Sequence, residues 1–491
     1  MKAISNWLET WTRFRPDAEA LVDVDAGRRW TYAALHNEAL CWAGRLAEAG
    51  IGPGDRVSLL AHNRGETFAL LFACAELGAI LCPMNWRLSA PELLWQLENA
   101  GSGLLVTDGE HADMLTSALP SLSLEDGCGD VAVTGPGSRL DDPWVMMYTS
   151  GTTGRPKGAL LTHGQLHWNA LNTILACDLA QTDSTLTFTP LFHTGGLNCL
   201  STPLLHRGGR VVLTRGFDPA QSLRLIQQEG VTLLMGVPTI YQMMADHPDF
   251  EGTDLSTVRD ALCGGAPLSA PLLRRYLARD IPLRQGFGMT EVGPNCFSMP
   301  HDAVESKIES VGKPIPHVAM RLVRPDGTDC DVDEPGELLL SGPAVFGGYW
   351  NNPAADAKSF VDGWFRTGDV LACDADGFYR VAGRIKEMFI SGGENVYPAE
   401  VEAAIFEHPG VAQVAVIGVP HERWGEVGHA FIEPQPGAAI DLDALRAHLL
   451  ARLAKYKVPK RFDLFDALPR TASGKIDKVS LKHQTLTEET P

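Results

Sequence analysis

Short apolar runs alternate with helical patterns over roughly residues 30 to 290, and this alternation constrains the fold more than any other feature. The runs of strand length are Arg56–Ala61, Trp144–Tyr148, Thr185–Thr189, Arg210–Thr214, Thr232–Gly236 and Ala261–Gly264. The helical stretches between them include Glu66–Gly78, Gln165–Cys177, Asp218–Glu229 and Ala270–Arg279. Strands that alternate with helices usually form parallel sheets with helices on their faces. The sequence therefore predicts a layered α/β architecture, in which ligands bind beyond the carboxyl ends of the strands.

The pattern changes after Glu291, where short strands are separated by Gly, Pro and Asp turns. These strands are Val318–Val323, Gly336–Ser341 and Gly377–Val381, and they predict a β-rich subdomain at about residues 300–385. A smaller α/β segment follows, with helix Pro398–Glu407, strands Val414–Val419 and His429–Glu433, and helix Leu442–Leu453. We therefore predict a large N-terminal domain over residues 1–385 and a small C-terminal domain over residues 386–491.

Charge and composition exclude several classes of protein. The net charge of -19 argues against a nucleic-acid-binding protein, because phosphate backbones require a basic face. The richest apolar run, Phe68–Cys82, is interrupted by Glu76, so no membrane span is expected, and the first residues do not resemble a signal peptide. The ten cysteines lack metal-ligand spacing. They suggest reduced thiols and a cytoplasmic protein.

The stretch YTSGTTGRPKGALLTH, from Tyr148 to His163, concentrates hydroxyl, glycine and basic residues. Hydroxyl groups and exposed backbone N–H groups hydrogen-bond phosphate oxygens, and glycines permit close backbone approach. The stretch follows an apolar strand and does not have the residue order of a Walker loop. We therefore predict a phosphate-binding loop that comprises Thr149, Ser150, Gly151, Thr152, Thr153, Gly154 and Lys157.

This loop resembles the phosphate-loop signature of the adenylate-forming superfamily, which includes acyl-CoA synthetases, luciferases and peptide-synthetase adenylation domains. Six further blocks similar to those of the superfamily follow in the same order. They are PLFHTGG (Pro190–Gly196), GGAP (Gly264–Pro267), QGFGMTE (Gln285–Glu291), RTGD (Arg366–Asp369), GRIKEMFISGGENVYPAEVE (Gly383–Glu402) and PRTASGK (Pro469–Lys475). The resemblance covers about residues 145 to 478. It implies a large domain followed by a small mobile domain, and ATP, Mg²⁺ and coenzyme A as cofactors.

The resemblance also assigns the nucleotide site to particular residues. Thr290 would contact the phosphate and Glu291 would bind Mg²⁺, which often takes one or two carboxylates together with nucleotide oxygens and waters. Asp369 would accept the ribose hydroxyls, with Arg384 in support. The adenine site would comprise Gly265, Ala266 and Pro267 on one side and Gly286, Phe287, Gly288 and Met289 on the other, with Phe287 as the stacking face.

Activation of a carboxylate brings two anions together, so charge neutralisation and positioning supply most of the catalysis. Lys475 resembles the late lysine of the superfamily, which reaches the carboxylate and the α-phosphate, and a compact charge on a flexible stem suits that task. His193 resembles the gate residue between the acid pocket and the nucleotide. In the superfamily the small domain rotates between the half-reactions about a hinge, here Lys386. The loop with Gly392, Gly393 and Glu394 would then line the coenzyme A tunnel.

The superfamily places the acid pocket along Thr194, Gly195, Gly196 and Cys199 and near Val237 and Pro294. Gly195 and Gly196 would leave space where hydroxycinnamate ligases often carry larger side chains. The surrounding residues are mostly apolar, and a buried second carboxylate on the substrate would need a partner. We therefore predict an acid with an apolar body. The sequence leaves open a medium- or long-chain fatty acid, as in fatty acid metabolism, and an aryl acid such as a hydroxycinnamate.

The predicted function is an ATP-dependent carboxylic acid–CoA ligase, which forms an acyl-adenylate and pyrophosphate and then an acyl-CoA and AMP. The same residues would serve an adenylating enzyme that transfers the acyl group to an amine or to the pantetheine of a carrier protein. That alternative stays open on the sequence alone. The oligomeric state is also open, and a homodimer is one arrangement considered.

Overall fold

The structure is a computed structural model of the 491-residue chain. It describes residues 6–115, 119–135, 137–149, 156–391, 394–471 and 475–488. Residue contacts divide the chain into two compact units. Unit 1 comprises residues 1–319 and 340–365, and unit 2 comprises residues 320–339 and 366–491. The domain boundary near Lys386 stays a prediction.

The first sheet of unit 1 consists of β3 (Arg56–Leu60), β4 (Ile80–Pro83), β5 (Leu104–Thr107), β6 (Ser121–Ser123), β7 (Pro143–Thr149) and β8 (Lys157–Thr162). The strands are ordered β6-β5-β3-β4-β7-β8, and all pairs are parallel except the antiparallel pair β7–β8. Strands β4 and β5 are buried at every position, as expected for parallel strands covered on both faces. The antiparallel pair places the predicted phosphate loop at one end of this sheet.

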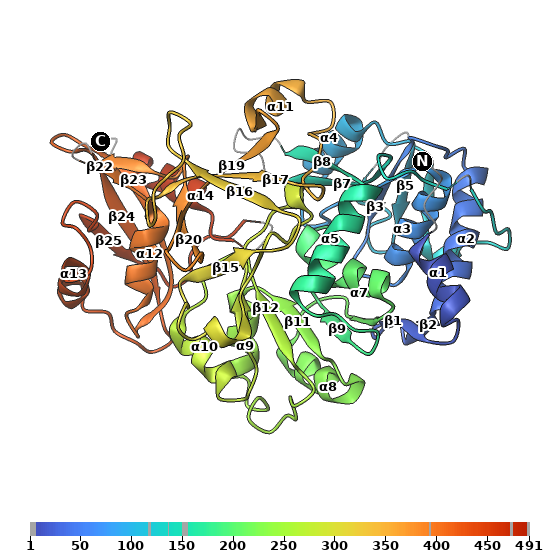
Figure 1. Cartoon of the computed structure of the whole chain (residues 1–491), viewed down its shortest axis with the longest axis horizontal. Coiled ribbons are helices and arrows are strands. Elements are labelled where there is room, and N and C mark those ends of the chain that lie inside the picture. The colour runs from blue at the N-terminus through green and yellow to red at the C-terminus, as the bar shows by residue number, and fades with distance from the viewer. Residues whose placement is uncertain are drawn as a thin grey trace. The chain divides into compact units, whose positions relative to one another are not determined.

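The second sheet of unit 1 consists of β1 (Glu19–Asp23), β2 (Arg28–Thr31), β9 (Ser184–Thr187), β10 (Arg210–Leu213), β11 (Leu233–Gly236), β12 (Asp260–Cys263) and β13 (Leu283–Gln285). Their order is β13-β12-β11-β9-β10-β1-β2, and only β1–β2 is antiparallel. Figure 1 shows β11 and β12 in green, close to helices α8, α9 and α10. Several blocks of the resemblance follow the carboxyl ends of these parallel strands.

The helices of unit 1 are α1 (Trp7–Phe14), α2 (Tyr32–Glu48), α3 (Glu66–Leu77), α4 (Ala90–Ala100), α5 (His163–Ala176), α6 (Thr194–Gly196), α7 (Thr202–Arg207), α8 (Pro219–Glu229), α9 (Pro238–Asp246), α10 (Ala270–Leu277) and α11 (Pro353–Ser359). Helix α5 begins where Thr162 and Gln165 form a capping box. The Thr162 hydroxyl accepts from the Gln165 N–H at 3.2 Å, and the Gln165 side chain accepts from the Thr162 N–H at 2.7 Å. This reciprocal pairing satisfies two N–H groups that lack helical partners and ends β8 at a defined residue.

The β-rich region consists of β14 (Phe297–Ser298), β15 (Ser310–Pro314), β16 (Ala319–Val323), β17 (Gly336–Ser341), β18 (Phe360–Val361), β19 (Trp364–Cys373) and β20 (Tyr379–Arg384). In unit 2, β19 and β20 pair antiparallel, and Asp369 lies opposite Arg384. Two residues that the resemblance assigns to the nucleotide site therefore come together through a strand pair.

The remaining strands of unit 2 are β21 (Phe389–Ser391), β22 (Glu394–Val396), β23 (Val411–His421), β24 (Gly425–Pro434) and β25 (Arg461–Leu464). Only β24–β25 is parallel. Helices α12 (Pro398–Phe406), α13 (Leu442–Leu450) and α14 (Lys478–Glu488) accompany this sheet. Val401, Ile405, Leu445 and Leu449 pack with buried strand residues in one core, so unit 2 has its own hydrophobic core.

The architecture confirms the predicted layered α/β fold, with mostly parallel sheets and a smaller α/β part towards the C-terminus. Most predicted strands and helices are present within a few residues of their predicted ends. The clearest omissions are β4 and β5, which lie within the alternating region, and the hairpin of β1 and β2, which begins before it. Strand β1 pairs with β10, with Leu21 opposite Val211. Such a long-range pairing leaves no local signal in the sequence.

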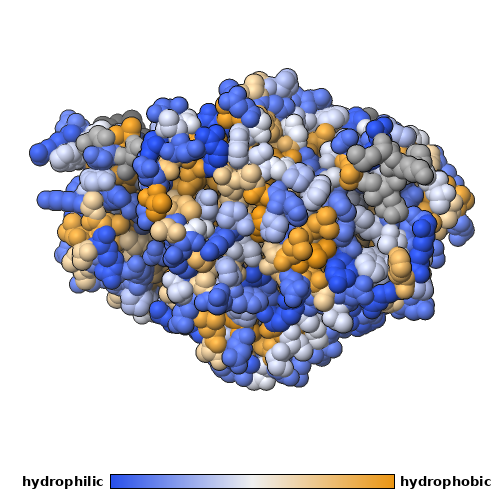
Figure 2. Space-filling view, viewed as in Figure 1, coloured by the Kyte–Doolittle hydropathy of each residue, from blue (hydrophilic) through white to orange (hydrophobic). Residues whose placement is uncertain are grey.

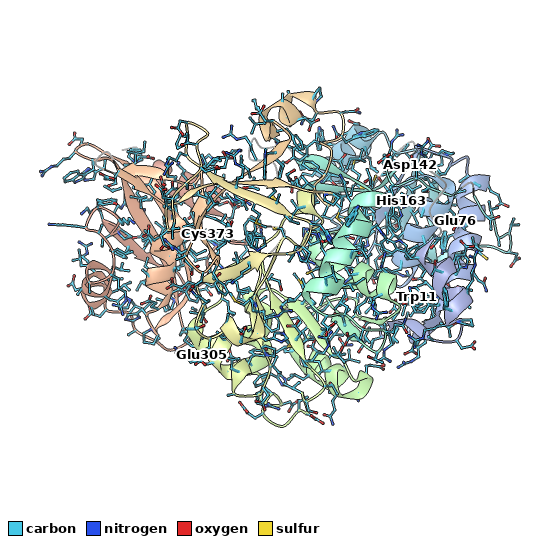
Figure 3. All side chains as sticks on the ribbon, in the orientation of Figure 1. Trp11, Glu76, Asp142, His163, Glu305 and Cys373 are labelled. Atoms are coloured by element: carbon cyan, nitrogen blue, oxygen red, sulfur yellow. The ribbon has the colours of Figure 1, made fainter. Side chains whose placement is uncertain are left out.

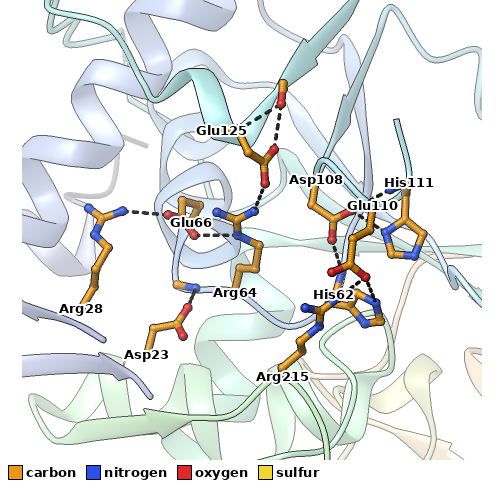
Figure 4. Close-up of polar contacts among 12 residues, drawn as sticks. Asp23, Arg28, His62, Arg64, Glu66, Asp108, Glu110, His111, Glu125 and Arg215 are labelled. Atoms are coloured by element: carbon orange, nitrogen blue, oxygen red, sulfur yellow. Dashed lines mark hydrogen bonds and ion pairs between the residues drawn. The ribbon is translucent and has the colours of Figure 1, made fainter. Parts of the chain in front are cut away.

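A network of charged residues connects loops near the first sheet (Figure 4). Glu66, at the start of α3, contacts Arg28 at 2.7 Å and Arg64 at 3.3 Å, and Arg64 also contacts Glu125. On the other side of the view, Asp108 accepts from the His62 backbone N–H at 2.9 Å. These contacts give the partly buried carboxylates ion-pair or hydrogen-bond partners, because a buried charge without a partner is costly.

The surface seen in Figure 2 is a mixture of hydrophilic areas and smaller hydrophobic ones. Among the helices in the described part of the chain, none combines the length and the apolar character needed to cross a membrane.

Candidate functional site

The predicted phosphate loop joins two antiparallel strands of the first sheet in unit 1. Thr149, the last residue of β7, lies opposite Lys157, the first residue of β8. The Thr149 hydroxyl donates to the Lys157 carbonyl at 3.4 Å. The other predicted members, Ser150, Gly151, Thr152, Thr153 and Gly154, lie outside the described residues. The loop thus begins at the carboxyl end of a strand, as the sequence predicted.

Lys157, Tyr349 and Glu291 form a connected polar group in unit 1. The Lys157 ammonium lies 4.5 Å from the centroid of the Tyr349 ring, a cation–π contact. The Tyr349 hydroxyl donates to Oε1 of Glu291 at 2.8 Å. Burial and the neighbouring carboxylate raise the pKa of Tyr349 well above its usual value, so the phenol stays protonated and remains a donor. The contact joins two residues predicted for the nucleotide site.

Tyr349 was not predicted from the sequence. It follows two glycines in the stretch GGYWNN, a composition that indicates only a turn. Its hydrogen-bond partner lies 58 residues earlier, so nothing local points to the contact.

Glu291 fits the role of a single-carboxylate magnesium ligand. It lies in a short 3-10 turn, Thr290–Val292, and is 8% exposed. Oε1 accepts the tyrosine hydroxyl, whereas no described residue donates to Oε2. No group of three or more His, Cys, Asp or Glu side chains suitable for a metal occurs among the described residues. Mg²⁺ often binds through one or two carboxylates together with substrate phosphates and waters, so this donor set fits the ion.

The two predicted walls of the adenine site follow neighbouring parallel strands. Strands β12 and β13 pair with Cys263 opposite Gln285, so the residues that follow them leave the sheet side by side. The first wall, Gly265, Ala266 and Pro267, is exposed. In the second, Phe287 is half-buried, and its ring lies edge-on to Phe297 with centroids 5.8 Å apart. The fold brings the two predicted walls to the same end of the sheet.

Two glycines in these walls are required by the backbone. Gly265 has φ 81°, a conformation that strains other residues. A Cβ on Gly288 would lie 1.9 Å from the Pro294 carbonyl oxygen. Next to it, the backbone N–H of Met289 donates to that oxygen at 3.2 Å. The turn that contains Gly286, Gly288 and Met289 is therefore held against the segment of Pro294.

On the acid side, His193 occupies the N-cap position of α6, and its ring lies 4.6 Å from that of Phe192. The hydroxyl of Thr194 accepts from the Asn198 side chain at 3.4 Å. A Cβ on Gly196 would lie 2.4 Å from the Pro190 carbonyl oxygen, so the missing side chain faces backbone rather than free space. A Cβ on Gly195 would meet only the Met235 methyl, at 3.4 Å, and Thr189 at 4.0 Å. Of the two glycines expected to leave space, only Gly195 does so.

A small cavity of about 10 Å³ adjoins Gly195 between β9, β11 and the turn Leu197–Ser201. Thr189 and Met235 are among its lining residues. The buried hydroxyl oxygen of Thr189 has no hydrogen-bond partner among the described residues. The cavity therefore combines an apolar side chain with an available hydroxyl.

The other predicted acid-pocket residues lie in less open positions. The Cys199 thiol donates to Oδ1 of Asn295 at 3.2 Å, and burial raises its pKa to about 12. Pro294 is buried. The Val237 side chain lies 3.6 Å from the position of a Cβ on Gly265, so it borders the adenine-side loop. Cys199 thus contributes a neutral thiol within a hydrogen-bonded group.

In unit 2, Asp369 has one oxygen with a partner and one without. Nε of Arg384 donates to Oδ1 at 2.7 Å. Oδ2 is buried and accepts no hydrogen bond from any described residue. Burial raises the pKa of Asp369, and the charge of Arg384 opposes that shift. A buried acceptor without a donor is costly in a folded protein, so this oxygen fits a ligand that brings hydroxyl donors, such as a ribose.

Lys475 belongs to the same group of charges in unit 2. The residue is exposed, but loss of hydration by nearby protein atoms lowers the pKa of its ammonium. The positive charge of Arg384 adds to this shift, whereas Asp369 and Glu387 oppose it. Glu394, on the predicted coenzyme A loop, is exposed and pairs with Ser391 across β21 and β22. The neighbouring Gly392 and Gly393 lie outside the described residues.

A separate cavity of about 30 Å³ lies in unit 1 and contains none of the predicted site residues. Glu76 and His163 are among its lining residues, and both are labelled in Figure 3. The His163 ring stacks on Trp144 with centroids 4.4 Å apart, and burial lowers its pKa to about 4. The volume suits about one or two water molecules rather than a substrate.

The sequence matches a family described as "AMP-binding enzyme" over residues 8–350 and one described as "AMP-binding enzyme C-terminal domain" over residues 400–475. It is 44% identical to a feruloyl-CoA synthase from Amycolatopsis sp over 98% of this chain and 99% of that protein. It is 39% identical to an indoleacetate–CoA ligase from Aromatoleum aromaticum over 97% of this chain and 96% of that protein.

Solved structures of a similar enzyme also match. The o-succinylbenzoate CoA synthetase of Bacillus subtilis in complex with its acyl-adenylate intermediate has a TM-score of 0.89 and 33% identity, covering 98% of this chain and 99% of that one. The same synthetase in complex with ATP and magnesium ion has a TM-score of 0.88 and 32% identity, over 97% and 99% of the two chains.

Proposed function

Because the chain belongs to the AMP-binding enzyme family, we propose which of its residues carry each half-reaction and which class of acid it takes. The chain is an ATP-dependent acid–CoA ligase. A carboxylate attacks the α-phosphorus of ATP and releases pyrophosphate, which gives an acyl-adenylate. The thiol of coenzyme A then replaces AMP at the acyl carbon, which gives the thioester and releases a proton.

In the proposed assignment, Asp369 and Glu291 bind the nucleotide and its metal. Asp369 accepts the ribose hydroxyls through its free oxygen, which is the observation that carries this assignment. Glu291 binds Mg²⁺, whose charge neutralises phosphate oxygens when the ion is bound. Thr149, Lys157 and Thr290 bind phosphate oxygens, and Phe287 stacks on the adenine.

Lys475 is proposed to stabilise the charge that develops during adenylation. Lys475 is exposed and interacts with the charges of Arg384 and Asp369, and a compact ammonium on a flexible stem can follow a moving phosphate oxygen. His193 is proposed to lie between the acid and the nucleotide, and Glu394 with its neighbouring glycines to serve the thioester half-reaction.

We further propose that the acid is an aryl acid. The similar feruloyl-CoA synthase and indoleacetate–CoA ligase are named for aryl acids.

Incubation of the purified protein with ATP, Mg²⁺ and single acids tests the function through pyrophosphate release. The panel should contain ferulate, indoleacetate, 2-succinylbenzoate and saturated fatty acids of several lengths. Aryl acids are expected to release pyrophosphate faster than fatty acids at equal concentration. A preference for fatty acids would contradict the proposed acid class without affecting the ligase reaction.

Addition of coenzyme A identifies the acceptor. Mass spectrometry should detect the acyl-CoA thioester, and omission of the acid should abolish AMP formation. Adenylate that accumulates without thioester would contradict the assigned second half-reaction.

The ten cysteines are all free thiols, which supports the proposal that the protein works in a reducing compartment, the cytoplasm. The homodimer stays a prediction, which light scattering of the purified protein tests.

A further inference from the structure

Tyr349 contacts the two charged residues on the phosphate side of unit 1, although it carries no charge itself. Its hydroxyl donates to Glu291 at 2.8 Å, and its ring lies under the Lys157 ammonium at 4.5 Å. One residue therefore touches both the proposed metal ligand and the proposed phosphate-binding cation.

The backbone around Tyr349 is held on two sides. On the first side it is attached to β8, directly after the phosphate loop. The Trp350 N–H donates to the Gly158 carbonyl at 2.8 Å, and Tyr349 itself bridges to Ala159. On the second side, the Tyr349 N–H donates to Oδ1 of Asp356 at 2.8 Å.

The segment of Tyr349 also holds the backbone of Glu291. The Phe346 N–H donates to the Glu291 carbonyl at 2.8 Å, and the rings of Phe346 and Tyr349 pack edge-to-face with centroids 4.8 Å apart. The carboxylate is thus fixed at its backbone and at Oε1 by one short segment. Oε2 has no partner among the described residues and is available to a ligand.

We propose that Tyr349 is a positioning residue for the metal-bound nucleotide, which orients the Glu291 carboxylate towards Mg²⁺ and holds Lys157 beside it. This inference rests on the proposed function, because it assumes that Glu291 binds the metal. A carboxylate that accepts one hydrogen bond keeps a fixed orientation, and loss of such a supporting partner typically weakens metal binding about 10- to 100-fold. The ring restricts the flexible lysine without neutralising its charge.

The test is equilibrium binding of ATP without any carboxylic acid, so that no turnover occurs. Calorimetric titrations with ATP are made at a series of Mg²⁺ concentrations. They give the Mg²⁺ concentration at which half of the metal-dependent gain in ATP affinity is reached. Tyr349→Phe removes the hydroxyl and keeps the ring. It should raise this concentration about tenfold while leaving metal-free ATP binding unchanged. Tyr349→Leu removes the ring as well and should also weaken metal-free binding, because Lys157 loses its contact.

Tyr276→Phe is the matched control. The Tyr276 hydroxyl donates to the Tyr241 carbonyl at 2.8 Å, and both residues are buried in unit 1. This variant loses one buried hydroxyl and should keep the Mg²⁺ dependence of the wild-type protein. A shift in the control equal to that of Tyr349→Phe would indicate a general structural effect and overturn the proposal.

A double substitution separates positioning from folding. In the Glu291→Gln background, Tyr349→Phe should add no further change in the Mg²⁺ dependence, because the carboxylate is already absent. Additive effects would overturn the proposal, as would a Tyr349→Phe variant with the wild-type Mg²⁺ dependence. If the wild-type protein binds no ATP with Mg²⁺, the proposed function fails as well. If the wild-type protein binds ATP with Mg²⁺ but Tyr349→Phe has the same Mg²⁺ dependence as the wild type, only the inference about Tyr349 fails.

Discussion

At the scale of single residues, the polar groups of the proposed site are only partly satisfied by the protein. Asp369 has a buried oxygen without a donor, and Glu291 has one oxygen bound and one available. Folded proteins rarely leave buried acceptors without a partner, because desolvation is then uncompensated. The buried Asp369 oxygen is therefore consistent with a position that a ligand completes.

The raised pKa of Asp369 predicts a pH dependence of nucleotide binding. Ribose hydroxyls donate best to an ionised carboxylate, so AMP affinity should fall as the pH is lowered through the raised pKa. Asp369→Asn should weaken AMP binding by about tenfold to a hundredfold and remove this pH dependence. Calorimetric titration from neutral to acidic pH measures both effects.

2′,3′-Dideoxy-AMP controls for titration of the phosphate, which both nucleotides share. The dideoxy nucleotide should bind the wild-type protein weakly and lose little affinity on Asp369→Asn. An equal loss for both nucleotides would contradict the contact between Asp369 and the ribose.

Lys475→Ala should slow adenylation by roughly 10²- to 10³-fold, by analogy with removal of one preorganised group that stabilises developing charge. The variant should still convert a synthetic acyl-adenylate to the thioester. Rapid-quench measurements of each half-reaction provide the comparison, with the exposed Lys482→Ala as the control. Equal losses in both half-reactions would contradict the assigned role.

The sequence motifs indicate which residues are candidates for the site, but they do not predict the contacts or the burial of each residue. The sequence indicated Asp369, Glu291 and Lys475 through the blocks that contain them. It gave no sign of Tyr349, because an aromatic residue after two glycines has many structural explanations. Contacts across 58 residues depend on how the chain packs.

At the scale of secondary-structure elements, the two adjacent glycines of α6, Gly195 and Gly196, have different surroundings. A Cβ on Gly196 would come within 2.4 Å of the Pro190 carbonyl oxygen, whereas a Cβ on Gly195 would meet a flexible methionine methyl at 3.4 Å. Gly196 lets α6 pack close to the Pro190 backbone, and Gly195 leaves room beside the cavity.

Gly196→Ala should therefore destabilise the protein by about 1–3 kcal/mol, because the rigid backbone must move. Gly195→Ala should leave the urea midpoint nearly unchanged and should reduce the rate with bulky acids more than with small ones. Denaturation curves and the acid panel test the pair together. Equal destabilisation by both substitutions would contradict the different environments of the two glycines.

Element boundaries were predictable where a local rule operates. The capping box of Thr162 and Gln165 starts α5, and a buried apolar run defines β3, which the sequence predicts at Arg56–Ala61. The π turn Leu197–Ser201 after α6 was not predicted, since it depends on packing against the sheet rather than on residue type.

At the scale of the whole molecule, all ten cysteines are free thiols, so no disulfide cross-links the chain. Cys74, Cys82, Cys177, Cys199, Cys263 and Cys296 are buried, and the other four are half-buried. Burial raises the pKa of Cys74 to about 12 and that of Cys177 to about 11, so few thiolates form at neutral pH.

The native protein should therefore react with a thiol reagent at no more than its four half-buried cysteines, and all ten should react after denaturation. Cys128 should be slow among the four, because burial raises its pKa to about 11. Addition of a reductant should leave the melting temperature unchanged, since no disulfide is lost. Rapid labelling of six or more cysteines in the native protein would contradict this burial.

The sequence by itself determined the layered α/β class, the order of the superfamily blocks and the adenylate-forming chemistry of the first half-reaction. These features depend on local periodicity and on short runs of residues, which do not require knowledge of distant contacts. The tertiary structure alone decided that β1 pairs with β10, that Tyr349 joins Lys157 to Glu291, and that Asp369 keeps an oxygen free. Each of these depends on groups brought together from distant positions, and burial and partners exist only once the chain has packed.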